Sequence, residues 1–177
     1  MEAPGVPDEA TVTRDGRSLA PCIDGVRTFA PVTHIDHRGR VFEIWPEESD
    51  YWSEPFVYAY AFTIRPGVTK GWGVHDHKHD RYTLIAGEVL LVLYDDRPES
   101  GTRGVIQRIM LAPEAVRQVT IPPGVWHLNV NVGHTEAQLI NFPTLPYDHA
   151  RPDRRTLPVS NEHIPFDATQ AFPTQWR

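Results

Sequence analysis

The strongest constraint on the fold is a series of short apolar segments, each bounded by proline or glycine. About ten such segments are expected to be strands, at residues 32–35, 41–45, 56–64, 70–77, 81–85, 88–94, 104–110, 116–121, 126–132 and 137–142. Turn residues separate them at regular spacing, and no segment has the period of an amphipathic helix. This pattern predicts an all-β sandwich or barrel.

The chain length favours one domain. Its 177 residues are enough to bury a single core. We expect residues 29–145 to form the barrel. Residues 1–28 are rich in proline, glycine and acidic side chains and are expected to be a flexible or partner-contacting arm. Residues 146–177 are polar and proline-rich and are expected to be a C-terminal extension that packs on the barrel.

Charge and composition argue against several classes of protein. The net charge is −6, whereas nucleic-acid binders usually carry a basic surface, so no nucleic-acid partner is expected. The single cysteine, Cys22, excludes an internal disulfide and indicates a reducing compartment. No apolar run approaches the roughly 20 residues of a membrane helix, and the N-terminus lacks a secretory signal. A cytoplasmic protein without membrane contact is therefore expected.

Residues 70–82 concentrate side chains that carry chemistry. Alternate residues of a strand face the same side, so His75 and His77 are expected to project together. A turn at residues 78–79 would return Asp80 opposite them, followed by Arg81. Two imidazoles, a carboxylate and a guanidinium would then share one pocket, and the less specific alternative is a pair of solvated histidines on an edge strand.

A second cluster begins at Pro122 and Gly124, which form a tight turn. The strand that follows carries His127 and Asn131 on one side. We expect His127 to meet the first cluster in the pocket, and the alternative is a hairpin with a half-exposed histidine.

These two clusters resemble the paired motifs of the cupin superfamily. His75-x-His77 matches the first motif, and Gly87 matches its closing glycine, but Arg81 or Tyr82 falls where cupins have a glutamate. Asp80 replaces that glutamate if the turn is tighter. The resemblance implies a double-stranded β-helix, or jelly roll. It also implies an alternative site in which His75, His77, Asp80 and His127 hold Fe, Mn, Ni or Zn.

A more particular resemblance, to the dTDP-4-dehydrorhamnose 3,5-epimerases, covers about residues 32–167. It rests on four motifs in the family's order. They are Asp36-x-Arg38-Gly39-x-Val41-x-Glu43, Gly67-Val68-x-Lys70-Gly71 ending at His75, Asp95-x-Arg97-x-x-Ser100-x-Thr102-x-Gly104, and Ile121-Pro122-x-Gly124-x-x-His127.

The family resemblance implies removal of a proton next to the 4-keto group of a dTDP-4-keto-6-deoxyhexose, without a cofactor. His75 takes the place of the family's base, tuned by His77 or Asp80, with His127 as a further catalytic residue. Arg81 is the nearest match to the cation beside the enolate.

The same resemblance implies a set of substrate-binding residues and a homodimer. Arg38 and Lys70 match residues that hold the pyrophosphate. Glu43, Tyr82 and Asn141 complete the expected set. Family members exchange N-terminal strands, so Arg38 would reach the partner's pocket. Asp167 is a loose match to an aspartate that pairs with the base.

One departure from the family leaves the reaction open. Asn141, a poor acid, falls in the slot of the tyrosine that returns the proton. Imidazoles on one side only suit a 3,4-ketoisomerase rather than an epimerase, unless Tyr82 serves as a substitute acid. Two further classes remain: a metal-dependent cupin oxygenase or isomerase acting on another small molecule, and a ligand-binding cupin without catalysis.

Overall fold

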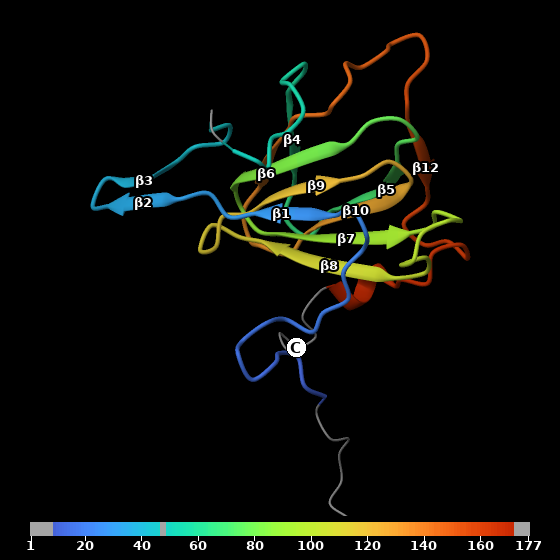
Figure 1. Cartoon of the computed structure of the whole chain (residues 1–177), viewed down its shortest axis with the longest axis horizontal. Helices are drawn as coiled ribbons and strands as arrows, with labels where there is room; N and C mark the ends of the chain where they lie inside the picture. Colours follow the sequence, from blue (N-terminus) through green and yellow to red (C-terminus); the bar gives the residue numbers. More distant parts are fainter. Residues whose placement is uncertain (1–8, 47–48, 172–177) are drawn as a thin grey trace, which may run out of the picture.

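The computed structural model describes residues 9–46 and 49–171, and this part of the chain folds into strands, loops and one short 3-10 helix (Figure 1). The first six strands are β1 Arg27–Phe29, β2 Thr33–Asp36, β3 Gly39–Phe42, β4 Tyr60–Ile64, β5 Thr69–Val74 and β6 Asp80–Ala86. The others are β7 Val89–Asp95, β8 Ile106–Leu111, β9 Gln118–Ile121, β10 Val125–Asn131, β11 Ala137–Asn141 and β12 Arg155–Leu157, and the helix η1 spans Ala168–Ala171. The predicted all-β fold class is confirmed.

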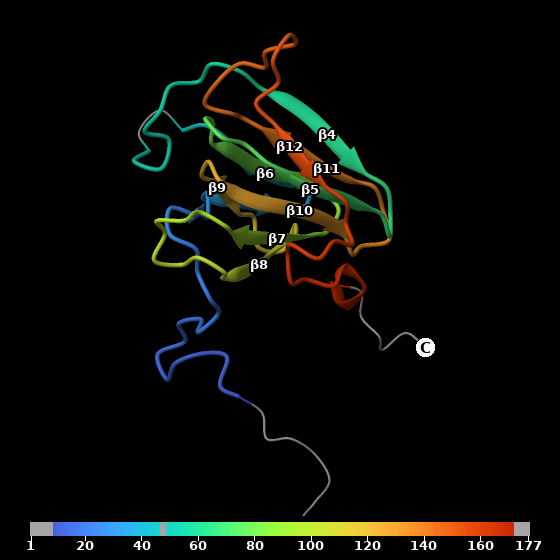
Figure 2. The ribbon, with the colours of Figure 1, turned by 90° about the vertical axis from the view of Figure 1, so that its right-hand side faces the viewer.

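Two antiparallel five-stranded sheets make up the body of the molecule. The first has the order β1-β9-β6-β11-β4, and the second has the order β12-β5-β10-β7-β8. The strands of the two sheets overlie one another in the view of Figure 2, and the arrangement is of the jelly-roll type. No helix within the described ranges is long and apolar enough to cross a membrane.

The main core lies between the two sheets and follows the alternation of the strands. It includes Tyr82 and Leu84 on β6, Leu91 and Leu93 on β7, and Leu139 on β11. Inward-facing residues at every second position are what a sandwich requires. Asp80 and Asn141 have the same parity as Tyr82 and Leu139, so the alternation that builds the core also turns these two polar side chains inward.

The outer faces of both sheets are covered as well. On the second sheet, Trp72 and Leu128 pack against Ile164 and Phe166 of the C-terminal segment. On the first sheet, an aromatic cluster formed by Tyr51, Trp52 and Phe142 is joined by Phe29 and Trp45. The strands β6 and β10, which carry Asp80 and His127, are therefore buried on both sides, and this fixes their register.

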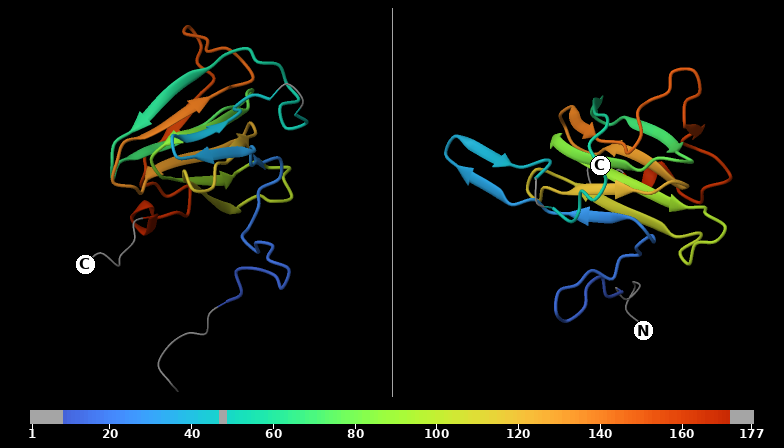
Figure 3. Two further views of the ribbon diagram at one scale, coloured as in Figure 1. Left: turned by 90° about the vertical axis from the view of Figure 1, so that its left-hand side faces the viewer. Right: turned by 45° about the horizontal axis from the view of Figure 1, so that its top comes forward.

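The β2–β3 hairpin stands apart from this body. It extends away from the two sheets in Figure 1 and in the right-hand view of Figure 3. Its residues Ile35 and Val41 are 76% and 65% exposed, and Val32 just before it is 75% exposed. Apolar side chains on a projecting two-stranded ribbon are usually covered by something else.

Several strand limits differ from the expected ones. β1 and β12 were not anticipated, β3 begins and ends earlier, and β4 begins at Tyr60 rather than residue 56. β5 ends at Val74 instead of residue 77, because the next backbone N–H groups bond to the carboxylate of Asp153 rather than to a neighbouring strand. β1 straddles the expected boundary between the arm and the barrel, and β12 adds the C-terminal segment to the edge strand β5.

Candidate active site

A cavity of about 410 Å³ opens between the two sheets, where β5 ends and β6 begins. It is lined by aromatic, cationic and titratable side chains. They are Tyr58, Tyr60, Phe62, Lys70, Gly71, His75, Lys78, Asp80, Tyr82, His127, Asn129, Tyr147, His149 and Arg154. A concave site with converging polar groups of this kind is the expected form of a small-molecule pocket.

His75 follows the last residue of β5, and both of its ring nitrogens face acceptors. Nδ1 bonds to the backbone carbonyl of Asp153, which can only accept, so Nδ1 carries a proton. Nε2 lies 3.2 Å from Oδ2 of Asp80. Nε2 therefore faces a carboxylate oxygen of a buried aspartate.

Asp153 also holds the loop that carries His75. Its carboxylate accepts the backbone N–H groups of Asp76 at 2.8 Å and of His77 and Lys78 at 3.2 Å each. Burial alone would raise the pKa of Asp153, but these bonds and the charge of His75 lower it overall. The loop is thus anchored to a residue more than 70 positions away in sequence.

Asp80 is the centre of the buried polar network and is 1% exposed. Besides His75, it accepts hydrogen bonds from Asn141 Nδ2 at 2.8 Å and from the Tyr82 hydroxyl at 3.3 Å. Burial opposes its charge, yet the hydrogen bond from His75, the charges that His127 and His75 carry at low pH and the bond from Asn141 hold the pKa of Asp80 well below its usual range. The carboxylate is therefore ionised at neutral pH.

His127 reaches the same group from β10. Its Nε2 lies 3.7 Å from Asp80 Oδ2, and its ring stacks on His75 with 5.4 Å between centroids. Burial lowers the pKa of His127 to about 4, against the pull of Asp80, so the ring is neutral at pH 7. Gly73 faces it across the strand pair, where a Cβ would lie 3.1 Å from Nε2.

Asn141 joins Asp80 to Tyr60. The backbone N–H of Arg81 donates to Asn141 Oδ1 at 2.8 Å, which identifies that atom as the oxygen. The amide nitrogen then donates both to Asp80 and, at 2.9 Å, to the Tyr60 hydroxyl oxygen. Burial and the charge of Asp80 raise the pKa of Tyr60 to about 12 and that of Tyr82 well above its ordinary value.

The prediction that His75 and His77 project together is wrong. His75 is 7% exposed and lines the cavity, whereas His77 is exposed to solvent. The alternation of a strand does not extend to His77, because β5 ends at Val74 and the backbone then turns around Asp153. The four-residue metal site with both histidines of the H-x-H pair is wrong for the same reason.

The prediction that Arg81 shares this pocket is also wrong. Arg81 follows Asp80 on β6, so it points to the opposite face of the sheet. Its guanidinium is fully buried between Trp45 and Trp52, at 4.8 and 5.3 Å from their ring centroids. It donates to backbone carbonyls of Phe142 and of the loop at residues 54–55. Arg81 therefore fastens the cover of the first sheet.

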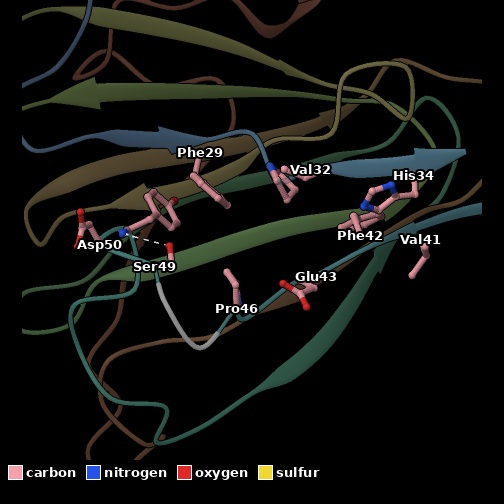
Figure 4. A pocket seen from close by; sticks show the side chains of 11 residues that line it. Phe29, Val32, His34, Val41, Phe42, Glu43, Pro46, Ser49 and Asp50 are labelled. Carbon is pink, nitrogen blue, oxygen red and sulfur yellow. Dashed lines mark hydrogen bonds between the residues drawn. The ribbon is translucent and has the colours of Figure 1, made fainter.

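The predicted substrate-binding residues divide into two groups. Lys70, Tyr82 and Asn141 lie in or directly behind the cavity wall. Arg38 lies at the tip of the projecting hairpin in an ion pair with Asp36, and within this chain it does not line the cavity. Glu43 lies in a separate hollow at the base of the hairpin (Figure 4).

The cavity residues missed from sequence include Tyr60, Lys78 and Arg154. Lys78 is 5% exposed, yet no carboxylate of the described residues pairs with it, and its Nζ lies 5.8 Å from the Tyr147 ring centroid. Arg154 lies in the C-terminal extension, where no substrate-binding residue was predicted. Asp167, the loose match to a partner of the base, bonds to Thr169 on the surface instead.

Three buried donors are close enough to hold a metal ion. The ligand atoms of His75, Asp80 and His127 lie within 4.8 Å of one another. Two imidazoles and one carboxylate suit non-haem iron and related divalent metals. The residues present therefore fit such an ion, with His77 left out.

Comparison with known proteins gives a consistent result. The profile of the dTDP-4-dehydrorhamnose 3,5-epimerase family matches residues 21–158. The probable low-salt glycan biosynthesis epimerase Agl13 of Haloferax volcanii is 31% identical over 136 residues, which are 76% of this chain and 86% of that protein.

A second relative and a crystal structure are also similar to this chain. The spore coat polysaccharide biosynthesis protein SpsL of Bacillus subtilis is 30% identical over 150 residues, which are 85% of this chain and 99% of that protein. The crystal structure of a dTDP sugar isomerase from Desulfovibrio desulfuricans G20 superposes with a TM-score of 0.77 at 25% identity, covering 83% of this chain and 92% of the other.

Proposed function

The chain belongs to the dTDP-4-dehydrorhamnose 3,5-epimerase family, and we propose that this nucleotide-sugar isomerase moves a proton next to the 4-keto group of a dTDP-4-keto-6-deoxyhexose. The observation that carries the proposal is the pairing of His75 with an ionised Asp80 in the wall of a cavity large enough for a sugar.

In the proposed step, Nε2 of His75 takes a proton from the carbon beside the ketone. The electron pair of the broken C–H bond forms the enolate. Asp80 stabilises the imidazolium that results, because its carboxylate lies next to Nε2. The neutral ring of His127 packs against His75 and leaves the charge of Asp80 directed at the base.

Lys78 takes the role that was expected of Arg81. Its ammonium lies in the cavity wall without a carboxylate partner among the described residues, so its charge is available to an anion. A cation already fixed in a site shielded from water stabilises a developing enolate oxygen strongly. Lys70 and Arg154, which are exposed at the cavity, would contact the diphosphate.

A homodimer that exchanges the β2–β3 hairpin is part of the proposal. The hairpin projects from the body with exposed apolar side chains, and it carries Arg38 at its tip. Placed on a partner, this arm would bring Arg38 and Glu43 towards the partner's cavity. Sedimentation of the intact protein should then give twice the mass of the chain. A cytoplasmic location suits a substrate made from nucleotides.

The proposal is tested by incubating the protein with dTDP-4-keto-6-deoxyglucose in D2O and following the sugar by NMR. Deuterium should appear at C3 or C5. Inversion at either carbon identifies an epimerase, and movement of the ketone to C3 identifies a ketoisomerase. Absence of exchange with this and other nucleoside diphosphate 4-keto sugars would contradict the proposal.

A second candidate follows from the three clustered donors of His75, Asp80 and His127. A divalent metal there would supply Lewis-acid chemistry to a bound carbonyl or oxygen chemistry to another small molecule. Metal analysis of gently purified protein decides between the two. A full equivalent of iron, manganese, nickel or zinc favours the second candidate, and less than about a tenth of an equivalent favours the first.

A further inference from the structure

We propose that Tyr60 is the proton donor that completes inversion in this enzyme, taking the place of the tyrosine that Asn141 replaces. The assignment rests on the proposed function and names a second catalytic group for it. Tyr60 lies on β4, directly opposite Asn141 in the β4–β11 pairing. The phenol of Tyr60, on the neighbouring strand, therefore lies beside Asn141, the position at which the family's tyrosine is missing.

The network around Asn141 leaves the proton of Tyr60 free. Because Arg81 donates to Asn141 Oδ1, the amide nitrogen is the atom that faces the Tyr60 hydroxyl. The hydroxyl oxygen therefore accepts from the amide, and its own hydrogen has no acceptor among the described residues. Tyr60 lines the cavity, so this hydrogen is available to a bound substrate.

The same hydrogen bond also stabilises the product of proton donation. Once Tyr60 has given up its proton, the phenolate oxygen still accepts from the Asn141 amide at 2.9 Å. Burial and the charge of Asp80 keep the pKa of Tyr60 raised to about 12, so the residue carries its proton at neutral pH.

The other cavity tyrosines are less suited to this role. The hydroxyl of Tyr82 donates to Asp80, so its proton is already committed. Tyr58 and Tyr147 have no hydrogen-bond donor to their hydroxyl oxygen among the described residues. Lys78 Nζ lies 5.8 Å from the ring centroid of Tyr147, but it makes no hydrogen bond that would hold the Tyr147 hydroxyl in place. Tyr60 alone of these four has a free proton and a fixed donor.

His75 reaches the cavity from the loop after β5 and Tyr60 reaches it from β4, and the two residues connect to different oxygens of Asp80. His75 faces Oδ2, and Asn141, which holds Tyr60, donates to Oδ1. His75 takes the carbon-bound proton and the enolate forms. Tyr60 then gives its hydroxyl proton to the same carbon, a new C–H bond forms and the ketone returns. Solvent restores the proton of Tyr60 and removes the one on His75.

The test separates exchange from inversion with dTDP-4-keto-6-deoxyglucose in D2O. Tyr60→Phe should lower the rate of inversion by about 100-fold or more, as expected for loss of a general acid. Exchange of the carbon-bound proton should stay within about threefold of the wild type, because His75 can return deuterium to the face from which it took the proton. Tyr94→Phe, a matched change on β7 away from the cavity, should alter neither rate.

The outcomes distinguish this assignment from the proposed function. Exchange in the Tyr60→Phe variant also shows that its site is folded. If the Tyr60→Phe variant both exchanges and inverts at the wild-type rates, the role of Tyr60 is overturned but the proposed function is not. The same holds if Tyr58→Phe, and not Tyr60→Phe, loses inversion. Migration of the ketone without inversion in the wild type would also overturn the role of Tyr60. No exchange in the wild type would overturn the proposed function and this assignment together.

Discussion

Replacing Asp80 by asparagine should slow proton abstraction while leaving the fold intact. Asn141 cannot flip to accommodate the change, because its oxygen is held by the backbone N–H of Arg81. The new side chain must therefore turn its oxygen towards Asn141 and its amide nitrogen towards His75. An N–H donor facing Nε2 favours the unprotonated ring, so the imidazolium formed in the reaction loses its partner.

The magnitude follows from the distance between the two groups. Two unit charges 3.2 Å apart attract by about 5 kcal/mol at an effective dielectric constant of about 20, which is an upper limit. A hydrogen bond to a charged group contributes about 1.5–3 kcal/mol net. Taking about 2–3 kcal/mol, at about 1.4 kcal/mol for each factor of ten, Asp80→Asn should lower kcat by roughly 30- to 150-fold.

The assay is the initial rate of deuterium incorporation at saturating dTDP-4-keto-6-deoxyglucose, with circular dichroism to check the fold. Asp76→Asn is the matched control. Asp76 is one residue from His75, but its carboxylate pairs with Arg155 on the surface, where ion pairs contribute about 0–1 kcal/mol. Equal rates for Asp80→Asn and the wild type, in a folded protein, would refute the role given to the carboxylate.

Two further predictions concern Lys78 and Asp95. Lys78→Met should lower kcat by about 100- to 1,000-fold, which is the usual cost of losing one group that stabilises an oxyanion. The same change should raise the melting temperature, because it removes a buried charge that has no carboxylate partner among the described residues. A lower melting temperature would contradict this account. Asp95 accepts bonds from Arg97, Ser100 and Thr102, which together lower its pKa against the effect of burial. Its contribution is present above about pH 4, the ordinary range of an aspartate, and is lost as the pH falls through the lower pKa of the folded state. Asp95→Asn should cost about 2–4 kcal/mol in the free energy of unfolding at pH 7, and the difference from the wild type should shrink at pH 3 in chemical denaturation.

The sequence predicted those strands whose alternation is complete and whose ends carry glycine or proline. β6, β7, β10 and β11 fall within a residue or two of the expected ranges. The three-residue strands β1 and β12 have no readable alternation, since Arg-Thr-Phe and Arg-Thr-Leu become strands only because β9 and β5 offer them free edges. Short edge strands of this kind depend on tertiary contacts rather than on local sequence.

The sequence predicted the site residues whose positions depend on the alternation of a strand or on a turn. It missed those whose positions depend on contacts with distant parts of the chain. The turn before Asp80 and the turn before His127 bring both side chains to His75 as the spacing implied. The outward position of His77 depends on Asp153, which lies 76 residues further along the chain and gives no local signal. Arg81 was misplaced although its parity with Asp80 already predicted the opposite face.

The most direct test of the central claim compares His75→Asn with His77→Asn in the deuterium exchange assay. The account predicts that the first variant loses exchange at the carbon beside the ketone by at least about 100-fold. The second variant should exchange at nearly the wild-type rate, since His77 lies outside the cavity. Exchange retained in a folded His75→Asn protein, or lost only in His77→Asn, would contradict the assignment of the base.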